Sequence, residues 1–345
     1  MKAIVFYEHG DTDVLKYEDV PTPACGPQEV LIRVAATGCN YNDIWARRGL
    51  PGMKFIFPHI SGCDVAGEVC DVGNEVTTVK AGDRVVVHPA ISCRTCEYCT
   101  SGQEYFCRQF KIFGFQTGPL QGGQAEYTKV PEINALPMPS NLSFQHAAAV
   151  PLVYLTAWHM LVTRANIRAG EDVLVWGAGS GVGSAAIQIA KLFGARVIAT
   201  AGTNSKLEKA RNLGADEVIN HSSQDVVAEV KRITNKRGVN LVFEHVGGAT
   251  WERSILSLAF GGRIVICGAT TGYDALTDLR YVFNKQLTIL GCHQGTKGEM
   301  VTVLKLVEAG HLRPVVDRVL PLRDVAHAHR IMEQREHFGK IVLTP

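Results

Sequence analysis

The chain has 345 residues, a formal net charge of +2, 46% hydrophobic residues and 20% charged residues. This composition is ordinary for a globular protein, and the length corresponds to about two domains. The basic residues are scattered, which excludes the basic patch of a nucleic-acid-binding protein. The first residues lack a signal-peptide pattern, and no apolar run reaches the roughly 18 residues of a membrane span. We therefore expect a cytoplasmic protein with no membrane partner and no nucleic-acid partner.

The N-terminal part of the chain contains short β-type runs separated by turn residues. Val30–Val34, Ala66–Val72 and Asp83–Val87 are such runs, with Gly26-Pro27 and Gly82-Asp83 at their borders. Short strands with frequent glycine and proline turns are typical of an antiparallel β domain. We expect this domain to cover residues 1–153.

Four cysteines stand close together within this domain, with the spacing C-x2-C-x2-C-x7-C: Cys93, Cys96, Cys99 and Cys107. Four thiolates can surround one tetrahedral Zn2+ at about 2.3 Å, which leaves no coordination position open. Disulfides and an iron–sulfur cluster are the alternatives, because both use the same residue type. We predict one structural zinc that orders a lobe at about residues 91–108. The six other cysteines are expected to be reduced thiols.

An apolar helical stretch, Ala147–Val162, leads into a region where strands and helices alternate. The expected strands are 173–176, 197–200, 217–219, 241–244, 264–267 and 288–290, and the expected helices are 182–193, 205–212, 225–234 and 250–259. Helices of this length between strands imply parallel βαβ units and a doubly wound sheet. We expect this domain at residues 154–296. A C-terminal segment, 297–345, follows with a helix at 299–309 and a strand at 340–344.

A glycine-rich turn joins the first strand and the first helix of the alternating region. Glycine permits the tight turn, and the backbone N–H groups at a helix N-terminus bind pyrophosphate. The strand–turn–helix context predicts a dinucleotide-binding fold. The expected cofactor contacts in this turn are Gly179, Ser180, Gly181, Val182 and Gly183.

The second strand of this region ends without the carboxylate that usually binds the ribose 2′-hydroxyl of NAD. Hydroxyl, amide and amino side chains stand there instead: Thr200, Thr203, Asn204, Ser205 and Lys206. Such groups suit a 2′-phosphate. The sequence therefore favours NADP(H), with NAD(H) as the alternative.

The whole chain resembles the medium-chain dehydrogenase/reductase superfamily, nearest to its quinone oxidoreductase and zinc-type alcohol dehydrogenase branches. The cysteine lobe and the glycine turn carry the resemblance, together with Pro58–Gly67, Ala81–Val85 and Gly339–Leu343. The resemblance implies an α/β protein with a GroES-like β domain, a Rossmann nucleotide-binding domain and an active site between them. It also implies a homodimer or homotetramer, with the strand Leu287–Cys292 paired across two nucleotide domains. Further cofactor contacts follow by the same resemblance: Thr156, Val246, Gly247, Gly268, and Lys340 at the pyrophosphate.

Alcohol dehydrogenases of this superfamily hold a second, catalytic zinc that polarises the substrate oxygen. Our alignment places Asn40, Cys63 and Leu152 at its ligand positions, with Asp64 where the family has a glutamate. Leucine cannot bind zinc, and a neutral amide is a poor ligand for it. The resemblance therefore implies a site without a catalytic metal.

A shift of the alignment by one residue remains an alternative, because it makes Cys39 a ligand beside Cys63. A third ligand is then needed, and His59 and His88 are the candidates. In that case the protein is a zinc-type alcohol dehydrogenase that acts on alcohols and carbonyls. A non-catalytic NADPH-binding protein, similar to the lens crystallins, is a further alternative.

Without a Lewis acid, the easier reaction is hydride transfer to a quinone or to an α,β-unsaturated carbonyl such as an enone or enoyl thioester. Negative charge then develops on a conjugated oxygen, which hydrogen-bond donors stabilise. Asn40 is the candidate for orienting the substrate oxygen or the nicotinamide, and Tyr41 for donating a proton. His293 follows the last sheet strand and is expected to reach the cleft. A small apolar or conjugated carbonyl substrate would lie among aromatic residues: Tyr41, Trp45, Phe113, Phe115 and Trp158.

Asn40 and its neighbours also resemble the reductive carboxylases of the superfamily. In those enzymes an asparagine, a Phe-Glu pair and a histidine hold CO2. The matches here are Asn40, Phe115-Gln116 and His293, and Gln116 replaces the glutamate. We therefore expect reduction without carboxylation.

Overall fold

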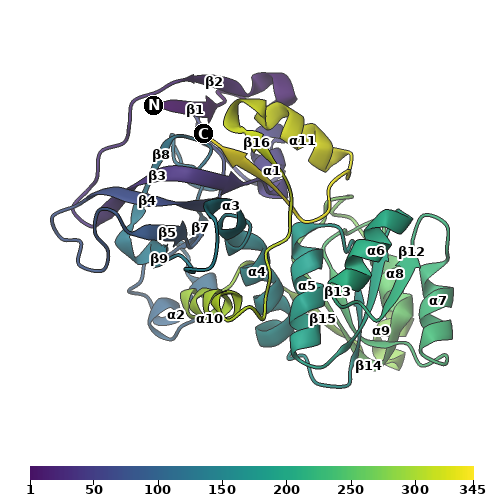
Figure 1. Ribbon diagram of the computed structural model, residues 1–345. Helices are drawn as coiled ribbons and strands as arrows, with labels where there is room; N and C mark the ends of the chain where they lie inside the picture. Colours follow the sequence, from purple (N-terminus) through teal and green to yellow (C-terminus); the bar gives the residue numbers. More distant parts are fainter. The chain divides into compact units, whose positions relative to one another are not determined.

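The computed structural model describes residues 1–345, which divide into two compact units (Figure 1). Unit 1 comprises Met1–Leu152 and Gly295–Pro345, and unit 2 comprises Val153–Gln294. No helix combines the length and the apolar character that crossing a membrane requires.

Unit 1 is built on a sheet with the strand order β16-β17-β3-β4-β5-β9, in which β8 also pairs with β3. Every pair is antiparallel except β16 with β17. This agrees with the predicted antiparallel β domain. The strands are β3 (Glu29–Gly38), β4 (Asp64–Val72), β5 (Arg84–Val87), β8 (Tyr127–Pro131), β9 (Ala135–Pro137), β16 (Val316–Pro321) and β17 (Lys340–Thr344). The C-terminal strand β17 lies beside β3, with Val342 opposite Gly38.

Two small pairs of strands and several helices complete unit 1. The pairs are β1 (Lys2–Val5) with β2 (Lys16–Asp19), and β6 (Ala90–Ile91) with β7 (Lys111–Ile112). The α-helices are α1 (Tyr41–Arg48), α2 (Glu97–Thr100), α3 (Phe144–Ala147), α10 (Lys297–Glu308) and α11 (Val325–Glu333). The 3-10 turns are η1 (Thr12–Val14), η2 (Glu104–Phe106), η3 (Glu132–Asn134) and η5 (Leu322–Asp324).

Alternation along β3 explains how the sheet of unit 1 buries one face. Val30, Ile32 and Val34 are buried, whereas Leu31 and Arg33 between them are partly or fully exposed. Side chains of a strand point to opposite faces in turn, so every second residue enters the core. These valines and isoleucines pack against Val65 and Val85 of the neighbouring strands.

Unit 2 is a parallel sheet with the order β12-β11-β10-β13-β14-β15, and its helices connect successive strands. This order confirms the predicted doubly wound fold. The strands are β10 (Asp172–Val175), β11 (Arg196–Ala201), β12 (Glu217–Asn220), β13 (Val239–Glu244), β14 (Leu258–Ile266) and β15 (Thr288–Gly291). The helices are α5 (Gly181–Leu192), α6 (Asn204–Asn212), α7 (Val226–Ile233), α8 (Trp251–Ser257) and α9 (Leu279–Asn284).

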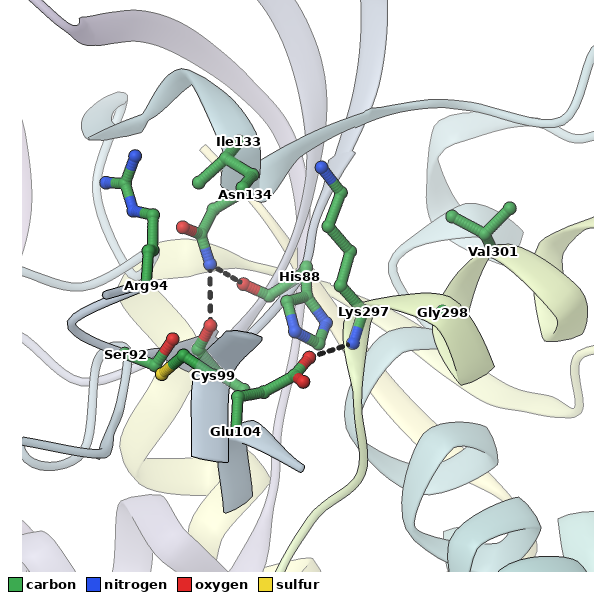
Figure 2. Close-up of a pocket in the computed structure, with 11 residues that line it drawn as sticks. His88, Ser92, Arg94, Cys99, Glu104, Ile133, Asn134, Lys297, Gly298 and Val301 are labelled. Carbon is green, nitrogen blue, oxygen red and sulfur yellow. Dashed lines mark hydrogen bonds between the residues drawn. The ribbon is translucent and has the colours of Figure 1, made fainter. Parts of the chain in front are cut away.

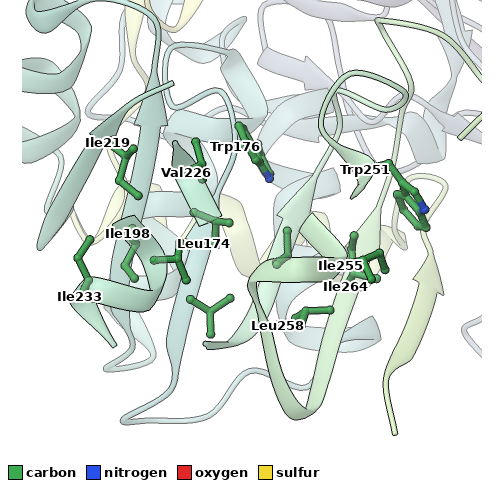
Figure 3. Close-up of a cluster of buried hydrophobic side chains, with 13 residues drawn as sticks. Leu174, Trp176, Ile198, Ile219, Val226, Ile233, Trp251, Ile255, Leu258 and Ile264 are labelled. Atoms are coloured by element: carbon green, nitrogen blue, oxygen red, sulfur yellow. The ribbon is translucent and has the colours of Figure 1, made fainter. Parts of the chain in front are cut away.

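The core of unit 2 lies between the sheet and its helices (Figure 3). Leu174 and Ile198 from the central strands pack with Val226 and Ile233 of α7 and with Ile255 of α8. All residues of β10 are buried, because helices cover both faces of a doubly wound sheet.

The structure differs from the sequence expectation at the predicted helix Ala147–Val162. Three segments stand there: α3, then α4 (Pro151–Trp158), then a π-helical stretch, η4 (His159–Arg164). Pro151 is the first residue of α4, where its missing N–H costs no intrahelical hydrogen bond. The sequence expectations also omitted α1, α9, α11 and β16, and they extended α8 into the first residues of β14.

Candidate functional site

A buried network of hydrogen bonds joins three distant segments of unit 1. The Nζ of Lys340 donates to Asp64 Oδ2 at 2.8 Å, to Asn40 Oδ1 at 2.6 Å and to the carbonyl oxygen of Cys39 at 2.6 Å. The Nδ2 of Asn40 donates to the same Asp64 oxygen at 2.9 Å. The second oxygen of Asp64 accepts from the backbone N–H of Leu152 at 2.7 Å. We call Asn40, Asp64 and Lys340 the polar cluster.

Element ends place the three side chains of the polar cluster. Asn40 precedes α1, Asp64 is the first residue of β4, and Lys340 is the first residue of β17. Asp43 in the first turn of α1 accepts from the backbone N–H of Asn40 at 2.8 Å and of Gly62 at 3.1 Å. Burial raises the pKa of Asp43 to about 7, and its two hydrogen bonds fix the start of α1 against the segment before β4.

The polar cluster brings together the three residues that stand at the expected catalytic-zinc positions. Asn40 Nδ2 lies 3.6 Å from Cys63 Sγ. The backbone N–H of Leu152 donates to Asp64, which also accepts from Asn40. The donor set does not fit a catalytic zinc, since a zinc site needs thiolate, imidazole or carboxylate ligands. Of the residues at the three expected ligand positions, only Cys63 offers such a group. The Lys340 ammonium already binds the Asp64 carboxylate and the Asn40 carbonyl oxygen.

The alternative alignment, in which Cys39 is a zinc ligand, does not give a zinc site in this structure either. Its side chain packs in an apolar cluster with Ile44, Leu322 and Ile341, and its backbone carbonyl faces Lys340. Burial raises the pKa of the Cys39 thiol far above its ordinary value, which disfavours the thiolate that zinc needs. In the whole chain, the one group of three or more His, Cys, Asp or Glu placed to hold a metal is the four-cysteine set.

The polar groups of two expected site residues, Lys340 and Asn40, are hydrogen-bonded to other groups of unit 1. The three N–H donors of Lys340 are filled by the three oxygens named above, so its expected contact with a pyrophosphate has no donor left. The amide of Asn40 is likewise bonded on both sides. Tyr41 is different: its ring packs against Trp45 at 5.3 Å, and no hydrogen bond to its hydroxyl is present.

Of the residues matched to the carboxylases, Asn40, Phe115 and Gln116 belong to unit 1, whereas His293 belongs to unit 2. Phe115 is buried and its ring lies 5.5 Å from Phe55. The Oε1 of Gln116 accepts from the backbone N–H of Ile112 at 2.8 Å. The Gln116 side chain therefore stabilises the turn between Ile112 and Gln116. Phe113 is fully buried in the sheet core.

The four cysteines of the predicted structural zinc do come together. All four Sγ atoms lie within 4.8 Å of one another, with Cys93 and Cys99 at 3.8 Å and Cys96 and Cys99 at 3.6 Å. Sulfurs at about 2.3 Å from one tetrahedral zinc are about 3.8 Å apart, so this spacing fits Zn2+. It excludes disulfides, which need about 2.05 Å.

Backbone N–H groups point at the sulfurs of this set. Cys96 N lies 3.4 Å from Cys93 Sγ, Cys93 N lies 3.5 Å from Cys107 Sγ, and Gln109 N lies 3.4 Å from Cys107 Sγ. Such donors stabilise thiolates in a metal site. The residues therefore fit a structural zinc held by Cys93, Cys96, Cys99 and Cys107, where the metal would link the lobe and supply no open position for a substrate.

The glycine turn of unit 2 has the geometry of an anion site at the start of α5. Ser180 is the N-cap, and its Oγ accepts from the backbone N–H of Gly183 at 2.9 Å. Gly177 has a φ of +58°, and a Cβ at Gly183 would lie 2.3 Å from the Gly177 carbonyl oxygen. Only glycine allows this close approach. The N–H groups of Gly181 and Val182 stand in the same first turn.

The end of β11 carries the residues expected near the ribose. Thr200 is buried, and its hydroxyl accepts from the Gly177 N–H at 3.3 Å, so it fixes the glycine turn. Thr203 is the N-cap of α6 and accepts from Lys206 N. Asn204 accepts from Asn220 Nδ2 at 3.1 Å. Thr203, Asn204 and Ser205 are exposed and Lys206 is half-buried.

Two histidines that the sequence reasoning missed stand beside these residues. His221 follows β12, and its Nδ1 lies 3.2 Å from Thr200 Oγ1. His245 follows β13, and its Nε2 lies 2.9 Å from the Trp176 carbonyl and 3.2 Å from Ser180 Oγ. Both positions follow the carboxyl ends of strands, where ligands of doubly wound sheets bind. That rule would have selected them.

The remaining expected cofactor residues also follow strand ends of unit 2 or lie in α4. The backbone N–H groups of Val246 and Gly247 donate to the buried carboxylate of Glu244 at 2.6 and 3.1 Å. Gly247 has a φ of +90°, and a Cβ there would lie 2.7 Å from Ala269 Cα. Gly268 follows β14, His293 is exposed after β15, and Thr156 is buried in α4.

A GroES-like β unit with a cysteine lobe and a doubly wound nucleotide-binding unit define a two-domain dehydrogenase or reductase. Two family models match the chain: an alcohol dehydrogenase GroES-like domain over residues 26–140 and a zinc-binding dehydrogenase over residues 181–309. Acryloyl-coenzyme A reductase of Metallosphaera sedula is 34% identical over 350 residues, which cover 100% of both proteins.

Solved structures of dehydrogenases and reductases are also similar to this chain. The crystal structure of an NAD-dependent alcohol dehydrogenase has a TM-score of 0.96 and 46% identity, with 100% of both chains covered. A 2-octenoyl-CoA carboxylase reductase in complex with NADP and 2-octenoyl-CoA has a TM-score of 0.89 and 30% identity, over 99% of this chain and 87% of the other. The chain belongs to the medium-chain dehydrogenase/reductase superfamily and is an oxidoreductase.

Proposed function

We propose that this protein is an NADPH-dependent reductase of a quinone or an α,β-unsaturated carbonyl compound, with an enoyl thioester as the preferred class. The observation that carries the proposal is the polar cluster. Asn40, Asp64 and Lys340 fill the expected zinc position with hydrogen bonds and an ion pair. A conjugated acceptor needs no Lewis acid, and two of the similar proteins are enoyl-thioester reductases by name.

A bound reduced nicotinamide would supply the hydride. Tyr41 is the donor toward the conjugated oxygen on which negative charge develops, because its hydroxyl is not used within unit 1. Asn40 and Lys340 act as positioning residues. They fix the residue before α1 and therefore the place of Tyr41, the first residue of that helix.

The cofactor proposal is NADP(H), bound by unit 2 at the glycine turn and the end of β11. Four features support it: the absence of a carboxylate from 200–206, the exposed hydroxyls of Thr203 and Ser205, Lys206 at the start of α6, and the nearby His221. Ser180 caps α5, so the first-turn N–H groups remain to bind pyrophosphate.

The cofactor is tested by the shift in melting temperature with NADPH and NADH at equal concentration. NADPH is expected to give the larger shift, and Lys206→Ala is expected to reduce the NADPH shift without changing the NADH shift. Lys209→Ala, one turn further along α6, is the control. A larger shift with NADH would refute the 2′-phosphate proposal.

The reaction is tested with a screen of NADPH oxidation. Enoyl thioesters, enones, quinones and aldehydes are offered to the zinc-loaded protein. Turnover of the first three classes, with little turnover of aldehydes, is expected. Turnover of aldehydes or alcohols alone would overturn the proposal.

The similarity to an NAD-dependent alcohol dehydrogenase favours a second candidate, alcohol oxidation with a catalytic zinc. The metal content separates the two. We expect about one zinc per chain, held by the four cysteines, whereas a zinc-type alcohol dehydrogenase holds about two. A second zinc that disappears with Cys63→Ser would favour the alcohol dehydrogenase.

The oligomer proposal is a dimer formed through unit 2. β15 is the edge strand of its sheet, so no further strand pairs with its outer side, where the Gly291 carbonyl accepts from Arg164 Nε at 3.0 Å. Apolar side chains around it are exposed, including Leu279, Phe283 and Ile289, and Leu276 is 93% exposed. Exposed apolar surface of this kind marks an association site. Light scattering should give a dimer for the wild type and for Tyr7→Glu, and a monomer for Phe283→Glu.

We also propose a reducing, cytoplasmic setting. No cysteine forms a disulfide in the structure, and six of the ten lie outside the four-cysteine set. Unpaired cysteines in such number are typical of reducing compartments.

A further inference from the structure

A cavity of about 470 Å³ lies in unit 1 between the cysteine lobe and the N-terminus of α10. Its polar lining comes from His88, Ser92, Arg94, Glu104 and Lys297, and Asn134 closes one side. Figure 2 shows His88, Glu104 and Lys297 close together, with Arg94 on the far side of Asn134. None of these residues belongs to the polar cluster or to the nucleotide-binding turn. The volume is in the range of small-molecule sites.

His88 gives this cavity a buried polar atom without a partner. The residue is 3% exposed, and its Nδ1 makes no hydrogen bond in the structure. Its backbone carbonyl is used, because Asn134 Nδ2 donates to it at 2.8 Å. A buried ring nitrogen left unpaired is costly, and native proteins satisfy most of them with water or a ligand. Burial and the Lys297 ammonium lower the pKa of His88 to about 3, so the ring is neutral and carries one N–H donor.

Two cations, Arg94 and Lys297, stand at the same place, and the carboxylates of Glu104 and Glu132 also act on Lys297. Burial, and then the neighbouring Arg94 guanidinium, hold the pKa of Lys297 below its ordinary value. Two cations that raise each other's electrostatic cost are stabilised by an anion between them. The lining residues hold two cations and one carboxylate, that of Glu104.

The Glu104 carboxylate already accepts a hydrogen bond from the N-terminus of α10. Its Oε1 accepts from the backbone N–H of Lys297 at 2.5 Å, at the first residue of α10. The helix has 12 residues, and its N-cap Thr296 binds the N–H of Glu299. The N–H of Gly298, between these two, lies at the cavity and is the helix donor left for a ligand.

We propose that this cavity is a second ligand site, which binds a small organic anion, a carboxylate or a phosphate monoester. The anionic group lies between Arg94 and Lys297, and the ring of His88 donates to it. A hydroxyl or amino group elsewhere on the ligand would bond to Glu104. Because Cys99 also lines the cavity, an occupied site stiffens the cysteine lobe.

The test is calorimetric titration of the zinc-loaded full chain with inorganic phosphate and, separately, with succinate. Titrations run with and without saturating NADPH, which fills phosphate subsites of the nucleotide unit. Saturable binding that NADPH does not abolish is expected for at least one anion. The tighter of the two probes identifies the ligand as a phosphate ester or a carboxylate.

Substitutions locate the site. Lys297→Gln and Arg94→Asn are each expected to weaken binding about tenfold or more, as loss of a charge-assisted hydrogen bond does. Asparagine is chosen at position 94 because Arg94 has a φ of +67°, which asparagine tolerates. Lys305→Gln, later in α10 and outside the cavity, should leave binding unchanged. Glu104→Gln should tighten binding, because it removes the one carboxylate from the lining.

A second readout uses the cysteine lobe. Release of zinc to a colorimetric chelator should slow several-fold when the anion is bound, and Lys297→Gln should remove this protection. No saturable binding of either anion would overturn the proposal. Binding that either Lys297→Gln or Arg94→Asn leaves unchanged would do the same.

Discussion

The ammonium group of Lys340 lies 2.8 Å from the carboxylate of Asp64, although 276 positions separate the two residues in the sequence. Both side chains are almost fully buried, at 4% and 0% exposed. Two charges removed from water are tolerated only when they are paired and their remaining hydrogen-bonding groups are satisfied. Asn40, the Cys39 carbonyl and the Leu152 N–H complete that requirement here. This ion pair adds to the pairing of β17 with β3 in holding the C-terminal strand at the site.

Lys340→Met is expected to lower the free energy of unfolding by about 3–5 kcal/mol, because it leaves the charge of Asp64 buried and unpaired. Denaturant unfolding monitored by circular dichroism measures the loss. Lys2→Met is the control, since Lys2 pairs with Asp19 on the surface, and little change is expected. Combining Lys340→Met with Asp64→Leu should recover part of the loss, and a double variant less stable than the single one would contradict this account.

Removal of the structural zinc should loosen the lobe at residues 91–108 more than it affects hydride transfer. Cys107→Ser removes one of four ligands and is expected to lower the zinc content from about one to near zero per chain. Hydrogen exchange measured by mass spectrometry should accelerate in that lobe first. Cys25→Ser, outside the set, should keep its zinc. Immediate loss of all activity on zinc removal, with the fold intact, would instead place the metal in catalysis.

Acid pH should destabilise the protein through its buried histidines. Burial and the neighbouring Arg47 lower the pKa of His329 to about 3, and burial lowers that of His59 to about 4. Below about pH 6.5 these histidines bind protons in the unfolded chain but stay neutral in the folded chain. The free energy of unfolding therefore falls as the pH drops toward 4. His329→Leu should flatten this loss by up to about 1.4 kcal/mol per pH unit. The exposed His311→Gln should keep the wild-type slope, and equal slopes for all three proteins would contradict the assignment.

Tyr41→Phe removes only a hydroxyl and should lower kcat by about 10²–10⁴ if Tyr41 supplies the proton or the oxyanion contact. The melting shift with NADPH should not change. Tyr17→Phe, an exposed tyrosine on β2, serves as the control. An unchanged kcat would remove Tyr41 from the site.

Asn40→Ala is expected to lower turnover indirectly, because the Asn40 side chain holds Lys340 and Asp64 rather than a ligand. Its kcat should fall with a loss of stability, whereas Tyr41→Phe keeps full stability. Thermal unfolding beside steady-state kinetics separates the two effects. A fall in turnover without any loss of stability would return Asn40 to direct contact with the substrate.

The sequence was informative wherever function depends on local spacing. The four cysteines share one short segment, so their meeting within 4.8 Å follows from geometry along the chain. The strand–glycine–helix order of residues 172–192 likewise predicts its own fold, because each element is defined by neighbouring residues. Short elements were missed where the pattern is brief or interrupted, as in α9, α11 and the break at Pro151.

The sequence by itself determined the superfamily, the two-part α/β architecture, the cysteine set and the absence of good zinc ligands at Asn40 and Leu152. Only the tertiary structure decided what occupies that place. From the sequence, Lys340 is expected to begin the final strand and, by resemblance, to contact the pyrophosphate, yet it supplies a buried cation to Asn40 and Asp64. The same holds for His88, Asn134 and Lys297, which line one cavity from three separate segments. Pairing between distant segments is set by sheet registry and core packing, and no local pattern records it.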